Sequence, residues 1–270
     1  MSLKNISSIQ KETFHVIAHN PMILFSFLIL GVIDALALTA LFLAHSAPFS
    51  KILAPVIRRF WGDRFLHYPD NFILLPKLFG YLHVVVLTVA GLIVSGIAIK
   101  LIEARVNGYS NISILSAAGT AFRRYFSLLA VWVPAFLLMR YGSRWLLPVL
   151  PASLPVQFTV LTALFLVIQT LTAFLFPAVM ISDQGFFRAV KEGAVLTVKN
   201  AGLILGIIFI PALAGVAVSL LKHFSPAFIP VFPESVLLIL YLGVVVSVAV
   251  DLFITSSMTI LYLKVRNTSV

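Results

Sequence analysis

Long apolar runs separated by short polar segments make up most of this chain. Crossing the roughly 30 Å hydrocarbon layer of a bilayer takes about 20 helical residues. Five runs are long enough, and a sixth, 126–139, becomes long enough if Arg123, Arg124 and Arg140 extend to the two interfaces. The pattern predicts an all-α polytopic membrane helix bundle, a single integral membrane domain over residues 1–270. Its six transmembrane helices are expected at about 21–45, 78–99, 124–142, 156–181, 201–221 and 235–263.

The composition agrees with this class. Of 270 residues, 61% are hydrophobic and 10% are charged, against about 25% charged residues in soluble domains. The chain has no cysteine, which excludes disulfides and thiolate sites. The first apolar run is longer than the core of a signal peptide. We therefore expect a retained first span, although residues 44–47 resemble a cleavage site.

An even number of spans places both termini on one side. Eleven Lys and Arg residues fall on that side and eight on the other. The positive-inside rule then favours cytoplasmic termini in a bacterial inner (plasma) membrane. The formal net charge of +10 comes from basic loops between apolar runs. Anionic lipid headgroups are the expected partners, and no basic cluster typical of nucleic-acid binding is present.

Five of the eight opposite-side cations lie in one loop, 46–77. Within it, residues 51–65 have the pattern of a helix lying in the membrane interface outside the cytoplasm. Its apolar face would hold Ile52, Leu53, Val56, Ile57, Phe60 and Trp61. The candidate headgroup-binding residues are Lys51, Arg58, Arg59 and Arg64. The helix is expected either as a cover on the bundle or as a lid or docking element.

Three amphipathic segments each precede an apolar run, at about 8–20, 113–124 and 185–200. At an offset of 77 residues, Ala117, Leu128, Pro134 and Ala135 align with Ala194, Leu205, Pro211 and Ala212. This organisation predicts three parallel repeats, each an interfacial helix followed by two spans. The units would be related by rotation about the membrane normal.

Several local motifs carry a family resemblance. They are Phe176-Pro177-Ala178-Val179-Met180, Gly185 with Ala189-Val190-Lys191-Glu192, Lys199-Asn200, and Leu261-Tyr262-Leu263-Lys264-Val265-Arg266. With these motifs the chain resembles the six-helix membrane domain found ahead of the catalytic domain in some glycerophosphodiester phosphodiesterases, and related stand-alone membrane proteins. The resemblance implies the architecture and no activity. The basic loop 46–77 departs from that pattern.

Two carboxylates, Asp34 and Asp251, lie near the middle of the first and last spans. A charge at the bilayer centre costs at least about 2.5–3.5 kcal/mol, so both side chains should be buried in the bundle. They would form a proton relay or cation site, or else hydrogen bonds to neutral partners. The neutral candidates are Ser256, Ser257, Thr255 and Gln169. His83, inside the second span, is expected as a bundle residue with its polar atoms satisfied.

No motif for catalysis, phosphate binding or a cofactor is recognisable. His15 and His19 share a helix face, but without a neighbouring carboxylate we predict no metal. Pro134, Pro177 and Pro211 predict kinks. The sequence favours a non-enzymatic scaffold, assembly or lipid-interacting factor. A small transporter or channel using Asp34 and Asp251 is the alternative, and a membrane-embedded lipid-modifying enzyme is the weakest hypothesis.

Overall fold

The computed structural model describes residues 3–108, 112–151 and 153–269, which are almost entirely helical and contain no strand. In chain order, its elements are α1 Leu3–His19, α2 Pro21–Phe42, η1 Leu43–His45, α3 Phe49–Trp61, η2 Asp63–Leu66, α4 Asp70–Val86, the π turn η3 Leu87–Gly91, α5 Leu92–Val106, α6 Ile114–Arg123, α7 Tyr125–Leu146, η4 Leu147–Val149, α8 Leu154–Thr172, α9 Leu175–Ile181, α10 Phe186–Phe224, η5 Ser225–Phe228 and α11 Ser235–Ser269.

Six helical segments of the described chain are long and apolar enough to cross a membrane. This confirms the predicted all-α, six-helix class and makes the chain a multi-pass membrane protein. The segments are Pro21–His45, Asp70–Val106, Tyr125–Val149, Leu154–Ile181, Phe186–Phe228 and Ser235–Thr268. The second and fifth extend well beyond the apolar runs that predicted them. Large apolar side chains cover the outside of the bundle, for example Val32 and Leu36 on α2, 57% and 62% exposed, as expected of a surface that faces lipid.

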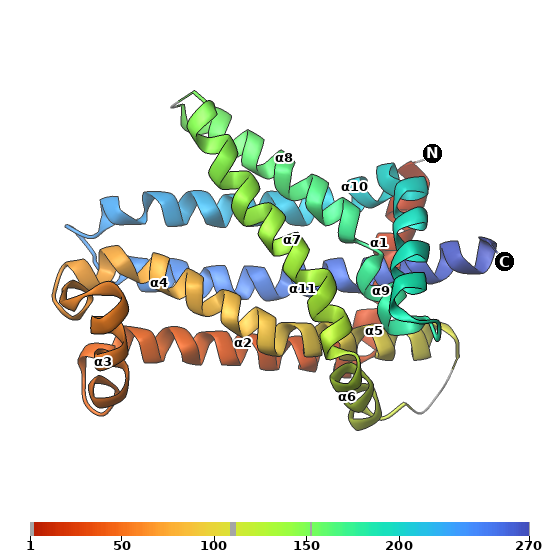
Figure 1. Ribbon diagram of the computed structural model, residues 1–270, viewed down its shortest axis with the longest axis horizontal. Coiled ribbons are helices and arrows are strands. Elements are labelled where there is room, and N and C mark those ends of the chain that lie inside the picture. Colours follow the sequence, from red (N-terminus) through yellow and green to blue (C-terminus); the bar gives the residue numbers. More distant parts are fainter. Residues whose placement is uncertain (1–2, 109–111, 152, 270) are drawn as a thin grey trace.

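Consecutive spans run in opposite directions, so α1 and the end of α11 lie at the same end of the bundle (Figure 1). We call this the terminal end, and the opposite end, which carries α3, the α3 end. At the terminal end a core cluster joins α5, α7, α9, α10 and α11 through Ile99, Leu128, Met180, Ile204 and Tyr262, all fully buried. At the α3 end the main cluster joins α2, α4 and α11 and includes no residue of α7 or α8.

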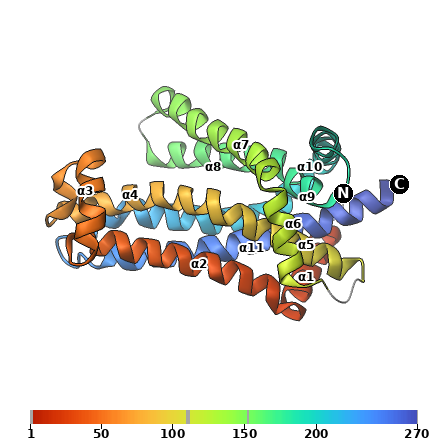
Figure 2. The same ribbon diagram turned by 60° about the horizontal axis from the view of Figure 1, so that its bottom comes forward.

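Helices α7 and α8 form a hairpin that is inclined to the other spans (Figure 1, Figure 2). The α8 helix packs on α7 and α10, whereas α4 packs on α2 and α11. The hairpin is therefore anchored through α5, α9 and α10 and separates from α4 toward the α3 end.

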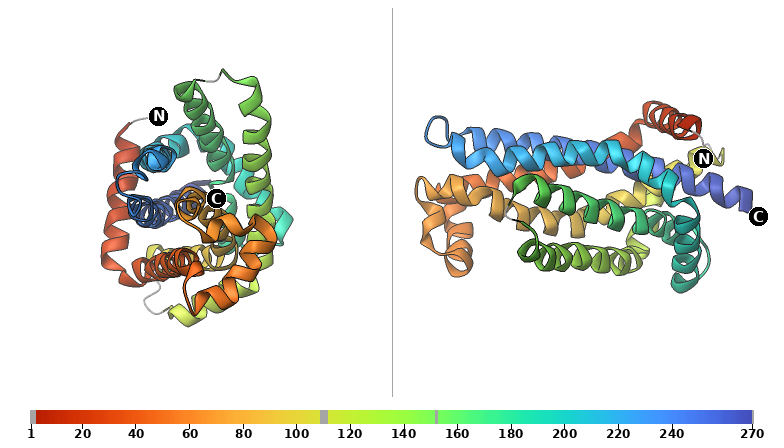
Figure 3. Two further views of the ribbon diagram at one scale, coloured as in Figure 1. Left: turned by 90° about the vertical axis from the view of Figure 1, so that its left-hand side faces the viewer. Right: turned by 90° about the horizontal axis from the view of Figure 1, so that it is seen from above.

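Three segments lie across the bundle at the terminal end: α1, α6 and the first part of α10 (Figure 3). Helix α10 starts at Phe186, runs crosswise and then bends into its span without a break in the helix. Its Glu192 accepts a hydrogen bond from the Tyr262 hydroxyl at 2.9 Å and lies 3.3 Å from Arg266 Nε. On α1, Glu12 pairs with Lys264. The crosswise segments thus hold the last turns of α11.

The residues aligned at the 77-residue offset have different surroundings. Leu128 is fully buried and Leu205 is 41% exposed. Pro134 is exposed and Pro211 is buried. These identities therefore do not mark equivalent core positions. The remaining support for a repeat is that each unit has the same order of elements, a crosswise segment followed by two spans.

Arg124, one of the arginines that could lengthen the third span by extending to an interface, is bonded within the protein. It lies where α6 meets α7, and its guanidinium donates hydrogen bonds to the carbonyls of Val179 and Ser182, the latter at 2.6 Å. These carbonyls belong to the end of α9, which has no further helical turn to satisfy them. The α7 span reaches its length by continuing to Leu146 instead.

Close helix packing at the terminal end depends on Gly96. A β-carbon there would lie 2.9 Å from Ala121 Cβ and 3.3 Å from Leu128 Cδ1, so α5 approaches α6 and α7 only because this position lacks a side chain. We expect Gly96→Ala to lower the free energy of unfolding by about 1–3 kcal/mol, measured by thermal unfolding in detergent micelles.

The matched control is Gly202→Ala, also in a helix but with nothing near the added carbon. It should leave stability unchanged or raise it by about 0.5–1 kcal/mol. Equal effects of the two substitutions would contradict this role of Gly96 in packing.

Candidate functional site

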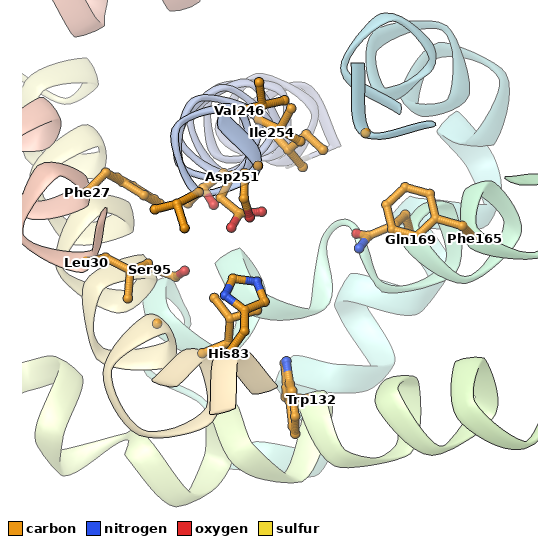
Figure 4. A pocket seen from close by; sticks show the side chains of 18 of the residues that line it. Phe27, Leu30, His83, Ser95, Trp132, Phe165, Gln169, Val246, Asp251 and Ile254 are labelled. Atoms are coloured by element: carbon orange, nitrogen blue, oxygen red, sulfur yellow. The ribbon is translucent and has the colours of Figure 1, made fainter. Parts of the chain in front are cut away.

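A cavity of about 470 Å³ lies inside the bundle and is lined from all six spans (Figure 4). Its walls are mostly apolar, with contributions from Phe27, Leu30, Phe79, Phe165 and Ile254. The polar lining consists of the ionisable groups of His83, Lys222 and Asp251 and the neutral side chains of Ser95, Gln169, Thr172, Ser219, Ser247 and Thr255. This size and this mixture of apolar walls with a few polar groups are typical of small-molecule sites.

Behind the cavity wall, Asp34 is paired with His83. Asp34 lies mid-way along α2 and is only 1% exposed, and its Oδ2 is 2.9 Å from His83 Nδ1 on α4. Its second oxygen, Oδ1, is buried without a hydrogen-bond partner among the described residues. Because a buried carboxylate is costly unless paired, this contact fixes the relative position of α2 and α4.

Asp251, on α11, lines the cavity itself and points into it on the side where His83 lies (Figure 4). Its side chain is hydrogen-bonded to Ser247, one turn earlier, and is in electrostatic range of both Asp34 and His83. It lies deep in the bundle, yet the cavity leaves it partly accessible. The two predicted carboxylates therefore belong to one cluster.

Lys222, on α10, belongs to this cluster although the sequence did not single it out. Expected to be a loop cation, it is half-buried, lines the cavity and interacts electrostatically with Asp34. A β-carbon on Gly243 would lie 2.8 Å from Lys222 Cε and 3.0 Å from Nζ. Glycine at position 243 thus makes room for the lysine against α11. The signal available in the sequence was a lysine directly after an apolar run.

Across the cavity, Gln169 on α8 directs its amide toward the space between the helices (Figure 4). Trp132 on α7 also lines the cavity, and its ring stacks on Phe136 at a centroid distance of 4.9 Å. The α7–α8 hairpin therefore supplies an amide and an aromatic ring on the side of the cavity away from Asp251 (Figure 4).

A π turn, η3, interrupts the second span between His83 and Ser95. Two of its residues, Leu87 and Gly91, line the cavity. The carbonyl of Thr88 within the turn accepts a hydrogen bond from the Tyr125 hydroxyl at 3.2 Å. Single π turns in α-helices are frequent at functional sites.

Within the described residues Asp34 contacts none of the Ser, Thr or Gln partners that the sequence offered, and its Oδ2 pairs with His83 instead. Ser257 contacts Thr13 on α1 at 3.2 Å, and Ser256 is buried without a hydrogen-bond partner among the described residues. Thr255 and Gln169 line the cavity. The hydroxyl bonded to Asp251 belongs to Ser247, which the sequence did not single out.

The predicted headgroup-binding residues lie away from the cavity, at the α3 end. Lys51, Arg58, Arg59 and Arg64 are all exposed. On α3, Ala54 and Ile57 are buried against the bundle, whereas Ile52, Val56 and Phe60 are 72%, 51% and 69% exposed. The side chain of Trp61 lies outside the described residues.

Two further groups of polar residues have no part in the cavity. Glu103 pairs with Lys100 at 2.7 Å on α5. The His15 and His19 rings lie 4.0 Å apart. Within the described ranges, no group of three His, Asp or Glu side chains is placed to hold a metal ion.

Compared with protein-family models, with curated proteins and with solved structures, the chain has no match. A functional assignment therefore rests on the residues of this cavity.

The Asp34–His83 pair should be energetically coupled. His83→Leu leaves a buried carboxyl without its partner, and we expect it to lower the free energy of unfolding by about 3 kcal/mol. Adding Asp34→Leu should recover part of this loss, because the unpaired carboxyl is gone. Thermal unfolding of both single variants and the double variant measures the coupling, and additive losses would contradict it.

Near α3, the Arg58 Nε hydrogen bond to Asp63 Oδ1, 2.7 Å long, lowers the pKa of the Asp63 carboxyl, with a smaller contribution from His67. Because Arg58 stabilises the charged carboxylate, Arg58→Gln should raise the pKa of Asp63 toward its ordinary value. Carbon NMR of the labelled carboxyl, titrated between about pH 2.5 and 6, measures it. Arg59→Gln is the control and should leave the pKa of Asp63 unchanged.

Proposed function

We propose that this chain is a membrane carrier that binds a small solute in the central cavity and exchanges it against a proton. The supporting observation is the placement of Asp251, His83 and Lys222 on one cavity of about 470 Å³ inside the spans. Ionisable groups within the bilayer are expensive and are typical of substrate or ion pathways. The proposal favours the transporter alternative over the scaffold that the sequence favours, and it involves no covalent chemistry.

The Asp34–His83–Asp251 cluster is the proposed proton site. His83 lies between the two acids in the network, since it is bonded to Asp34 and interacts with Asp251. A proton taken up here changes the charge of the cavity lining directly. Solute and proton would then compete for the same negative charge, which is the minimum requirement for exchange.

The α7–α8 hairpin is the proposed moving element. It is packed at the terminal end and has no share in the main cluster at the α3 end. The helix break at Ala173–Phe174, between α8 and α9, and Pro134 inside α7 are positions where the backbone can bend. Toward the terminal end the cavity borders the core cluster of Met180 and Tyr262, with which it shares Leu92, Ile99 and Met258.

For the setting, we propose a bacterial inner membrane with both termini in the cytoplasm, on the positive-inside count. Lys222 no longer contributes to the opposite side of that count, because it lines the cavity. We also keep the proposed likeness of architecture to the phosphodiesterase membrane domains and the three-unit repeat. The crosswise placement of α1, α6 and the start of α10 supports the repeat (Figure 3).

A second candidate, a lipid-interacting factor, is favoured by α3. Its exposed residues Ile52, Val56 and Phe60 follow one another at helical spacing beside exposed arginines. Such a surface suits the boundary between acyl chains and anionic headgroups. In the carrier this helix would anchor the α3 end in the interface while the hairpin moves.

A cysteine placed in the cavity tests the carrier, and the chain contains no other cysteine. Ser95→Cys lines the cavity. In a carrier it becomes accessible from each side in turn, so a membrane-impermeant maleimide should label it in right-side-out and in inverted membrane vesicles. Labelling from one side only, at every pH tested, would contradict the proposal.

Two control positions show how a water-exposed cysteine and a lipid-facing cysteine react in that experiment. Asp63→Cys, exposed near α3, should be labelled from a single side. Val167→Cys, 55% exposed on the outer surface of α8, faces acyl chains and should resist labelling from both sides, because thiolate does not form without water.

A further inference from the structure

The ionisable groups around the cavity carry more negative than positive charge. Asp34 and Asp251 contribute two carboxylates, and Lys222 contributes one cation. His83 adds a charge only when protonated. With a neutral His83, these four groups in and directly behind the cavity wall together carry one negative charge in excess.

The excess charge is located at Asp251. Asp34 is shielded from the cavity, paired with His83 and in range of Lys222. Asp251 reaches the cavity, and its hydrogen bond is to the neutral Ser247. A carboxylate that faces an otherwise apolar space gains most from a cation that enters with its own apolar surface, because both are then removed from water together.

The rest of the wall fits such a cation. Phe27, Phe79, Phe165 and Trp132 bring aromatic rings from four different helices to the cavity. Aromatic faces attract organic cations, and most strongly in a site shielded from water. The Gln169 amide, on the side opposite Asp251, adds one neutral polar contact (Figure 4).

We propose that the solute is a monovalent organic cation with an apolar, aromatic or aliphatic body, held by the Asp251 carboxylate. This inference rests on the proposed function in taking the central cavity as the solute site. A proton on the Asp251–His83–Asp34 network removes the excess negative charge and releases the cation. Cation binding to the protonated network therefore expels the proton, which couples cation movement one way to proton movement the other way.

Tetraphenylphosphonium and tetraphenylborate provide a matched pair of probes. The two ions have the same shape and apolar surface and opposite charge. Binding of each radiolabelled ion to the purified full chain in neutral detergent separates the effect of charge from partition into micelles. We expect saturable binding of tetraphenylphosphonium, with tetraphenylborate bound at least tenfold more weakly. Equal binding of both, or preference for the anion, would overturn the proposal.

Variants of Asp251 test whether tetraphenylphosphonium binds at this carboxylate. Asp251→Asn should weaken tetraphenylphosphonium binding at least tenfold, because the charge contact is lost in a medium of low dielectric constant. Asp251→Glu keeps the charge and should retain a measurable part of the affinity, which also controls for a folding defect in the amide variant. Asp63→Asn, the same change in an exposed carboxylate near α3, should leave binding unchanged. An Asn variant that folds and binds like the wild type would contradict the assignment.

Proton coupling is measured on the same samples. Affinity should fall as the pH is lowered from about 8 to 5, where histidines and buried carboxylic acids take up protons. At a pH within the range where affinity falls, so that part of the network carries a proton, adding tetraphenylphosphonium to weakly buffered wild-type protein should release protons, and adding it to Asp251→Asn should not. Binding without proton release would overturn the exchange step.

The labelling experiment on Ser95→Cys separates the two proposals. If Ser95→Cys is labelled from both sides but the protein does not prefer tetraphenylphosphonium, the carrier proposal stands and the organic-cation proposal is rejected. If Ser95→Cys is labelled from one side only and tetraphenylphosphonium binds strongly through Asp251, the cation site stands and the carrier proposal is rejected.

Discussion

A carboxylate buried in the middle of an apolar helix determines the arrangement of this bundle. Asp34 has almost no exposed surface and its partner comes from another span, His83 at 2.9 Å. Inside a bilayer no water is available to replace that partner. The first two spans must therefore pack in the one rotation that brings these side chains together. Asp251 and Lys222 then complete the charged group from the last two spans.

The ends of the bundle are built on different principles. At the terminal end, Glu12 and Glu192 of the crosswise helices form ion pairs with the C-terminal turns of α11. These turns lie beside a densely packed apolar cluster. At the α3 end, the apolar cluster joins only part of the bundle and leaves the α7–α8 hairpin aside. Because the hairpin is packed into the bundle only at the terminal end, it can rotate about that end relative to the other spans.

The sequence was sufficient for the helix count, because several apolar runs of span length in one chain are typical of membrane bundles and rare in soluble folds. It also marked Asp34 and Asp251, since the cost of charge in hydrocarbon does not depend on the fold. It did not reveal Lys222 or the pairing of His83, because both depend on how far each helix is rotated toward its neighbours. The capping of α9 by Arg124 was missed for a related reason: a basic residue at a helix end is compatible with solvent, lipid or a neighbouring carbonyl.

The π turn at Leu87–Gly91 sets which residues of the second span share a face. His83 and Ser95 are twelve positions apart, and in an uninterrupted α-helix they would point about 120° away from each other. A π turn accommodates one additional residue and reduces that angle to about 20°. Both side chains line the cavity. Deleting a single residue from the turn would straighten the helix and keep its apolar character, yet turn one half of its polar face out toward the lipid.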